Sequence, residues 1–207
     1  MKAKPFPCGA IILAAGGSTR MGRPKQLLAI GGTSLLRRVT DAVLASPVTS
    51  VVVVLGANAA AIRPEIAGLP VIAVENTGWE EGLGSSIRSG VQALESLSPP
   101  PDAAVLILGD QPNLTPAAIV RLIRTHRDGG KSIVAARYDG HPGPPALFSR
   151  RHLPELLALR GAGGARLLFK RHADLLATVD LPDLGVDLDN PADYRRFIAH
   201  RTAHDHR

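Results

Sequence analysis

Residues 9–28 of the chain read Gly-Ala-Ile-Ile-Leu-Ala-Ala-Gly-Gly-Ser-Thr-Arg-Met-Gly-Arg-Pro-Lys-Gln-Leu-Leu. Residues 10–15 form a continuous apolar run closed by two glycines, which is typical of a strand buried in the centre of a sheet. Residues 16–25 combine three glycines, two hydroxyl side chains and three cations. Glycines let backbone N–H groups approach a phosphate, and cations neutralise its charge. The stretch therefore predicts a buried strand followed by a phosphate-binding loop.

This loop differs from the two commonest phosphate-binding motifs. Gly17 and Gly22 have the Walker spacing, but an Arg-Pro pair follows where Lys and Ser or Thr are required. The dinucleotide fingerprint needs Gly-x-Gly, which the adjacent glycines do not supply. We therefore expect an extended loop over a polyphosphate, with Arg20 and Lys25 reaching toward it. An ordinary glycine-rich turn with solvated cations is the alternative.

Composition narrows the class of protein. The chain has 207 residues, which suits one domain, and 45% of them are hydrophobic, enough for a sizeable core. Its net charge of +6 favours an anionic partner. Aromatic residues make up only 3% and the cations are scattered, so we expect no nucleic-acid partner. Cys8 is the one cysteine, which excludes an intrachain disulfide. No apolar run is long enough for a membrane span, and we expect a cytoplasmic protein.

Apolar runs alternate with helical patterns along most of the chain. After the strand at 10–15 we expect strands at 51–55, 71–74, 103–108 and 132–136. Helices are expected at 34–45 with Thr33 as N-cap, 59–66, 84–97, and from the cap Thr115 to about 126. This alternation predicts an α/β fold whose parallel sheet is covered on both faces. We expect one domain over residues 1–207, with a nucleotide-binding part at about 9–136 and an acceptor-binding part at about 137–190.

Ligands of such sheets bind beyond the carboxyl ends of the strands, which directs attention to the segments after 74 and 108. Ser85 and Ser86 stand near a helix start, where they either bind an anion or a base edge or only cap the helix. Asp110 follows the strand at 103–108 and suits a Mg²⁺ ligand, with a turn-capping role as the alternative. Asp187 and Asp189 alternate along an expected short strand, so their side chains would point the same way.

The segment at 137–170 looks less regular. Residues 140–145 read Gly-His-Pro-Gly-Pro-Pro, which we expect to form neither a regular helix nor a central strand. His141 is a candidate general base, although a surface role is the commoner one for a histidine beside prolines. Near the end of the chain, Asn190 is expected to cap a helix that has Pro191 at its first position.

Several of these motifs resemble one enzyme family. Leu-Ala-Ala-Gly-Gly followed by Arg-Met-Gly-x-Pro-Lys-Gln in residues 13–26, and Gly-Asp-Gln-Pro at 109–112, resemble motifs of the molybdenum cofactor cytidylyltransferases. These enzymes are relatives of the molybdopterin-guanine dinucleotide enzymes. The resemblance covers nearly the whole chain and implies a three-layer, Rossmann-like nucleotidyltransferase fold with a mostly parallel central sheet.

The resemblance also implies an activity. It implies Mg²⁺-dependent transfer of CMP from CTP to the phosphate of a molybdopterin-type cofactor, with release of pyrophosphate. A molybdoenzyme or its maturation chaperone would receive the product. Another NTP, another phosphorylated metabolite and a non-catalytic nucleotide-binding role remain alternatives. Relatives usually have Asp where this chain has Ala162, a departure on the acceptor side.

The candidate site residues fall into four groups. Arg20, Lys25 and Asp110 are the candidate catalytic residues. The implied nucleotide-binding set is Leu13, Ala14, Ala15, Gly16, Gly17, Arg20, Lys25, Asn76, Gly82, Ser85 and Ser86. The implied acceptor-binding set is His141, Gly143 and Arg166. The implied metal ligands are Asp110 and Asp187, with Asp189 as the alternative to Asp187.

Overall fold

The computed structural model describes residues 6–186 and 188–205, with no description of the side chains of 202–205. Its main strands are β1 (Cys8–Ala14), β4 (Ser50–Leu55), β5 (Ile72–Glu75), β6 (Ala103–Leu108), β7 (Ile133–Tyr138), β8 (His141–Ser149) and β9 (Leu176–Asp180). The α-helices are α1 (Leu35–Leu44), α2 (Ala59–Ile62), α3 (Leu83–Glu95), α4 (Pro116–Gly129), α5 (Leu153–Leu157), α6 (Arg166–Arg171) and α7 (Pro191–Asp205). A small antiparallel pair, β2 (Ala29–Ile30) and β3 (Thr33–Ser34), precedes α1.

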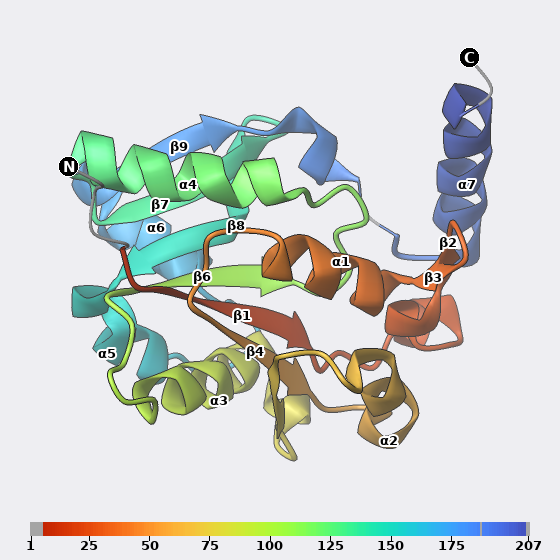
Figure 1. The fold of residues 1–207 in the computed structure, drawn as a ribbon, viewed down its shortest axis with the longest axis horizontal. Coiled ribbons are helices and arrows are strands. Elements are labelled where there is room, and N and C mark those ends of the chain that lie inside the picture. The colour runs from red at the N-terminus through yellow and green to blue at the C-terminus, as the bar shows by residue number, and fades with distance from the viewer. Residues whose placement is uncertain (1–5, 187, 206–207) are drawn as a thin grey trace.

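One seven-stranded sheet forms the middle layer, in the order β5-β4-β1-β6-β8-β7-β9. The neighbouring pairs are parallel except those that β8 makes with β6 and β7. In Figure 1, α1 and α4 cover one face of the sheet and α3 and α5 the other. The predicted three-layer α/β fold with a mostly parallel sheet is confirmed. None of the helices in the described part of the chain has the length and apolar character of a membrane span.

Strand β1 is a continuous apolar run because both of its faces are covered. Ile12 packs in the core layer that contains Leu36 and Ile119 of α1 and α4. Ile11 packs in the opposite layer, which contains Ile87 and Phe169 of α3 and α6. A strand with one solvent-exposed face would alternate apolar and polar residues, whereas both faces of β1 are buried.

The segment at 140–145 corrects a prediction. Part of it belongs to β8, an internal strand of the sheet. Residues 141–143 pair only with β7, Pro144 and Pro145 have no partner in either register, and β6 pairs with residues 146–149. Prolines are tolerated there because one edge needs no ladder hydrogen bonds, and a register irregularity beside Ala136 accommodates them.

Two smaller predictions also need correction. Ser34 rather than Thr33 caps α1, because the Ser34 hydroxyl accepts from the backbone N–H of Arg37. Leu188 and Asp189 belong to no strand, so the short strand expected there is wrong for these residues. Asp187 lies outside the described residues. The expected caps Thr115 and Asn190 are confirmed by their side-chain hydrogen bonds to backbone N–H groups.

Candidate active site

A cleft of about 470 Å³ lies beyond the carboxyl ends of β1 and β6. It is referred to below as the main cleft. Its walls include these sequence-predicted residues: Leu13, Ala15, Gly16, Gly17, Arg20, Lys25, Gly82, Ser86 and Asp110. Gln26, Trp79 and Asp189 also line it. The main cleft is therefore where the strand ends, the glycine-rich loop and the acidic residues meet.

The glycine-rich loop is held in shape by two side chains. Gln26 is buried, and its amide donates to the carbonyls of Ala14, at 2.8 Å, and Gly16, at 3.2 Å. The Ser18 hydroxyl accepts from the backbone N–H of Lys25 at 3.0 Å. These bonds join the beginning and the end of the loop, so its backbone is fixed without a ligand. Gln26 was quoted in the sequence motif, but only the fold reveals this positioning role.

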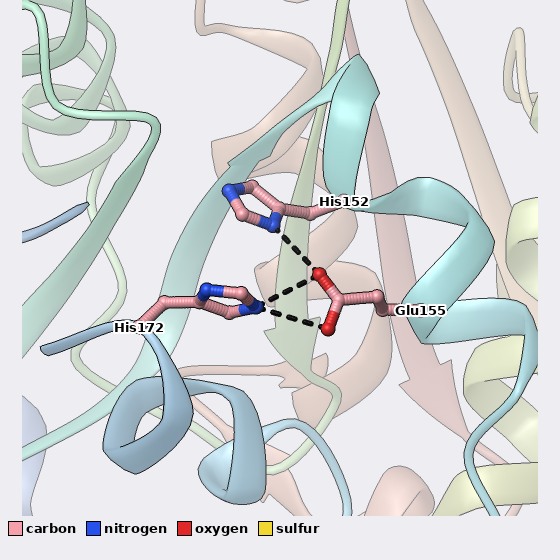
Figure 2. Close-up of side chains that lie close together, drawn as sticks. All are labelled: His152, Glu155 and His172. Carbon is pink, nitrogen blue, oxygen red and sulfur yellow. Dashed lines mark hydrogen bonds and ion pairs between the residues drawn. The ribbon is translucent and has the colours of Figure 1, made fainter.

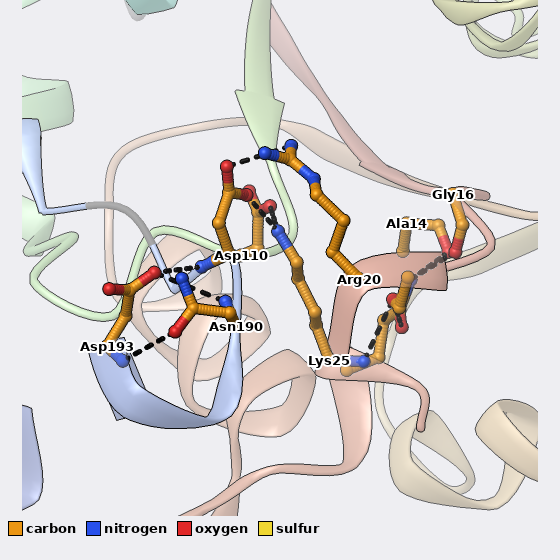
Figure 3. A network of polar contacts seen from close by, with 10 residues as sticks. Ala14, Gly16, Arg20, Lys25, Asp110, Asn190 and Asp193 are labelled. Atoms are coloured by element: carbon orange, nitrogen blue, oxygen red, sulfur yellow. Dashed lines mark hydrogen bonds and ion pairs between the residues drawn. The ribbon is translucent and has the colours of Figure 1, made fainter. Parts of the chain in front are cut away.

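Two cations and two carboxylates converge in the main cleft. The Lys25 ammonium lies 2.6 Å from Asp189 Oδ1 and 3.5 Å from Asp110 Oδ2. Arg20 lies 2.8 Å from Asp189 Oδ2 and is 75% exposed, so it can move toward an anion in the cleft. Figure 3 shows Lys25 extending from the loop toward Asp110, with Arg20 beside it. The hydrogen bond from Lys25 lowers the pKa of Asp189, which keeps that carboxylate charged.

The start of α7 positions Asp189. One Asp193 carboxylate oxygen accepts from the backbone N–H groups of Asp189, at 3.1 Å, and Asn190, at 3.2 Å. The Asn190 side chain in turn accepts from Ala192 and Asp193. Tyr194 donates to the carbonyl of Ala29 and so ties this turn to the segment that follows the glycine-rich loop. The helix cap predicted from sequence therefore also fixes an acidic residue at the cleft.

Buried residues support the wall of the main cleft that faces the glycine-rich loop. Asn76 is buried and donates to the hydroxyls of Ser85, at 2.8 Å, and Ser86, at 3.1 Å. Its side-chain oxygen accepts from the N–H of Gly78. Of this group only Ser86 is a wall residue, whereas Asn76 and Ser85 brace the loop from behind. Gly82 has φ of 111°, and a Cβ there would lie 2.8 Å from the backbone of Gly161.

A second cavity of about 320 Å³ adjoins the main cleft and shares Leu13, Leu83 and Leu108 with it. It is called the apolar cavity below, because most of its wall is hydrophobic. Ala162 and Arg166 of the predicted acceptor side line it.

The other two acceptor-side candidates do not line either cavity. His141 is exposed at the start of β8. A Cβ at Gly143 would lie 2.5 Å from the Tyr138 hydroxyl, so packing alone explains this glycine. Ala14 also lies outside the walls, although its carbonyl holds Gln26. The roles of these residues toward substrate stay predictions.

Comparison with known proteins agrees with this arrangement. The model of the MobA-like NTP transferase domain matches residues 10–181. The chain belongs to this family. The resemblance seen in the sequence is confirmed at this level, and the MobA-like domain is that of a nucleotidyltransferase enzyme. Asp189 and α7 follow the matched range.

Relatives of this MobA-like protein cover nearly its whole length. It is 31% identical to nicotine blue oxidoreductase from Paenarthrobacter nicotinovorans, over 93% of this chain and 98% of that protein. It is also 31% identical to the purine catabolism protein PucB from Bacillus subtilis, over 92% and 95%. The crystal structure of Rv0371c from Mycobacterium tuberculosis has a TM-score of 0.80 and 30% identity, over 95% of this chain and 100% of that one. Rv0371c has also been crystallised in complex with manganese, a structure that matches with a TM-score of 0.77 and 29% identity, over 94% and 99%.

Proposed function

We propose that this nucleotidyltransferase transfers CMP from CTP to the phosphate of a molybdopterin-type cofactor and releases pyrophosphate. One observation carries the proposal: the glycine-rich loop, Lys25, Asp110 and Asp189 meet in a single cleft at the carboxyl ends of β1 and β6. The choice of CTP and of the acceptor rests on the sequence motifs. The two relatives named above carry names that refer to different processes, so neither name decides the substrate.

In this reaction an oxygen of the acceptor phosphate attacks the α-phosphorus of CTP. The bond between the α-phosphorus and the bridging oxygen breaks, and pyrophosphate leaves with the electron pair. The acceptor is already anionic, so no strong general base is needed. Arg20 and Lys25 would bind the triphosphate and offset the charge that develops on the leaving group. Residues 9–136 would thus bind the nucleotide and 137–190 the acceptor.

The donor set at the main cleft fits a divalent metal. Asp110 and Asp189 place carboxylate oxygens on either side of one cationic group, the Lys25 ammonium. Mg²⁺ is commonly held by one or two carboxylates together with substrate phosphates. When bound, it would stabilise negative charge on the phosphoryl oxygens. We propose Asp110 and Asp189 as its ligands, and Asp187 stays a prediction outside the described residues.

The apolar cavity favours a second candidate, the same chemistry on another acceptor. Ala162 replaces a carboxylate that relatives usually carry, and it lines this cavity beside hydrophobic side chains. A site without that carboxylate suits an acceptor with a larger apolar surface. Arg166 at the same wall would bind the acceptor phosphate in either case.

Pyrophosphate release tests the proposal directly. The purified protein is incubated with Mg²⁺ and each of the four NTPs, with and without purified molybdopterin cofactor. We expect release that needs both CTP and the cofactor. Release with CTP and a different phosphorylated acceptor would support the second candidate, and preference for GTP would refute the cytidylyltransferase assignment. A molybdoenzyme or its chaperone as recipient, and a cytoplasmic location, stay predictions from sequence.

A further inference from the structure

Three side chains away from both cavities face one another. His152 ends the short 3₁₀ helix Arg150–His152, Glu155 lies on α5, and His172 follows α6. Their ligand atoms all lie within 4.8 Å of one another, an arrangement drawn in Figure 2. None of the three is a wall residue of the main cleft or of the apolar cavity. The function proposed above does not use this cluster.

The Glu155 carboxylate stands between the two imidazole rings. Its Oε1 lies 3.1 Å from His152 Nδ1 and 2.8 Å from His172 Nε2. The side chain of His152 is only 3% exposed, whereas Glu155 and His172 are 29% and 21% exposed. The cluster is therefore enclosed on the His152 side and reachable from solvent on the other. An ion could enter without local unfolding.

A buried hydroxyl orients His152. The second ring nitrogen, Nε2, lies 2.9 Å from the hydroxyl oxygen of Ser132, which is itself buried. Arg151 Nε donates to Nε2 at 3.4 Å, so Nδ1 carries the ring proton and donates it to the Glu155 carboxylate. Histidines that bind metals nearly always donate their other N–H to such a partner. A metal ion at Nδ1 would displace this proton, and Nε2–H would then donate to the Ser132 hydroxyl.

The Glu155 carboxylate lies within hydrogen-bond distance of both imidazole rings, and His172 Nε2 is also 2.9 Å from Oε2. Metals bind the carboxylate form of glutamate and the neutral form of histidine. Arg171 pairs with Glu155 Oε2 at 3.1 Å but is 65% exposed, so Oε1 remains available.

We propose that His152, Glu155 and His172 bind one Zn²⁺ ion, with water as the fourth ligand. Two imidazoles and one carboxylate are a donor set that suits Zn²⁺ better than Mg²⁺, which prefers oxygen alone. Tetrahedral zinc with bonds of about 2.1 Å separates its ligands by about 3.4 Å, so only small side-chain movements are needed.

The position of this cluster suggests what the ion would do. It would fasten α5 to the end of α6, and the segment between those helices carries Ala162 and Gly163 of the apolar cavity. The ion would therefore stiffen the cavity wall from outside.

The experiment measures zinc binding to the full-length chain, independently of nucleotidyl transfer. Chelator-treated protein is titrated with Zn²⁺ by calorimetry and thermal melting, and with Co²⁺ by visible absorption. The parent protein and every variant carry His204→Gln and His206→Gln, because these two histidines near the end of the chain could compete for zinc. The key variant is His172→Gln, because glutamine can still donate a hydrogen bond to Glu155 but offers no imidazole. The matched control is His126→Gln, a change to a histidine on α4.

We expect one Zn²⁺ per chain and a rise in Tm of about 5–10 °C at a hundredfold excess over Kd. His172→Gln should weaken binding by about a hundredfold or more and abolish the cobalt spectrum, whereas the His126→Gln control should bind like the parent. Equal zinc affinity in the parent and His172→Gln would overturn the proposal. So would a parent whose Tm does not respond to zinc, and the cluster would then be a hydrogen-bonded contact only.

Discussion

Replacing Lys25 by alanine should affect nucleotide transfer and metal binding in opposite directions. The Lys25 ammonium contacts Asp189 at 2.6 Å and Asp110 at 3.5 Å, and its side chain is only 13% exposed. Both carboxylates are the proposed metal ligands, so Lys25 competes with a divalent cation for them. The same ammonium would offset charge on the departing pyrophosphate. Removing it should therefore slow transfer and strengthen metal binding.

The magnitudes follow from the geometry. Loss of one preorganised donor to developing charge typically lowers the rate by about 10²–10³. For the metal, a unit charge at about 4 Å near a protein surface contributes about 4 kcal/mol before screening. The carboxylates are 34% and 39% exposed, so solvent reduces this contribution to about 1–2 kcal/mol. We expect Lys25→Ala to lower kcat/KM by a few hundredfold and to raise Mn²⁺ affinity by about tenfold.

The assay compares kcat/KM for CTP and Mn²⁺ binding, followed by electron paramagnetic resonance, in the parent, Lys25→Ala and a control. Arg37→Ala is the matched control, because Arg37 is a cation on α1 that pairs with Asp41 on the same helix. Its neighbour Arg38 is unsuitable, since it donates to the carbonyl of Pro112 beside the cleft. An equal, small loss of kcat/KM in both variants would refute the role toward the triphosphate. Unchanged or weaker Mn²⁺ binding in Lys25→Ala would refute the competition.

Four further predictions concern the main cleft and the fold. Asp110→Ala should lower kcat by about a thousandfold at saturating Mg²⁺ while a thermal melt stays nearly unchanged, because the 39% exposed carboxylate carries little stability; retention of half the activity would exclude it as a ligand. Asn76→Ala should destabilise the fold by about 2–3 kcal/mol in urea unfolding, because two buried hydroxyls lose their partner; a loss below about 0.5 kcal/mol would contradict the bracing role. Ala15→Gly should reduce the preference for CTP over GTP by about tenfold in kcat/KM, because a methyl group leaves the cleft wall; an unchanged ratio would locate base choice elsewhere. Glu155→Gln should lower Tm relative to the parent above about pH 5, and this difference in Tm should shrink as pH falls from about 4.5 toward about 2, because hydrogen bonds from His172, His152 and Arg171 lower the pKa of Glu155 to about 2; a difference in Tm that stays constant over this pH range would contradict the prediction.

The Glu155 prediction depends on the sign of the linkage. A carboxyl whose pKa is lower in the folded state contributes its stability above the unfolded pKa. That contribution is lost as pH falls through the folded pKa, because folded and unfolded chains then bind the proton alike. The parent should thus approach the stability of Glu155→Gln in acid.

Local sequence was sufficient to predict the centre of the fold. An uninterrupted apolar run predicts a strand covered on both faces, and β1 is such a strand. Glycines and cations directly after it predicted a loop at the carboxyl end, where Lys25 indeed lines the main cleft. Asp110 was predicted as a site residue in the same way, because the carboxyl ends of parallel strands meet at one edge of the sheet. Each of these inferences needs only the residues next to a strand.

Only the tertiary structure could decide the contacts between distant segments. Lys25 and Asp189 are separated by 164 positions, and no local periodicity reports that they meet. Strand β8 belongs to the sheet despite its prolines, because β6 pairs only with residues 146–149 of this strand. Glu155 joins His152, three residues before it, to His172 beyond α6 because α5 and α6 pack on the same core layer. These contacts depend on how whole helices and strands pack against one another. The residues next to each side chain in the sequence do not determine that packing.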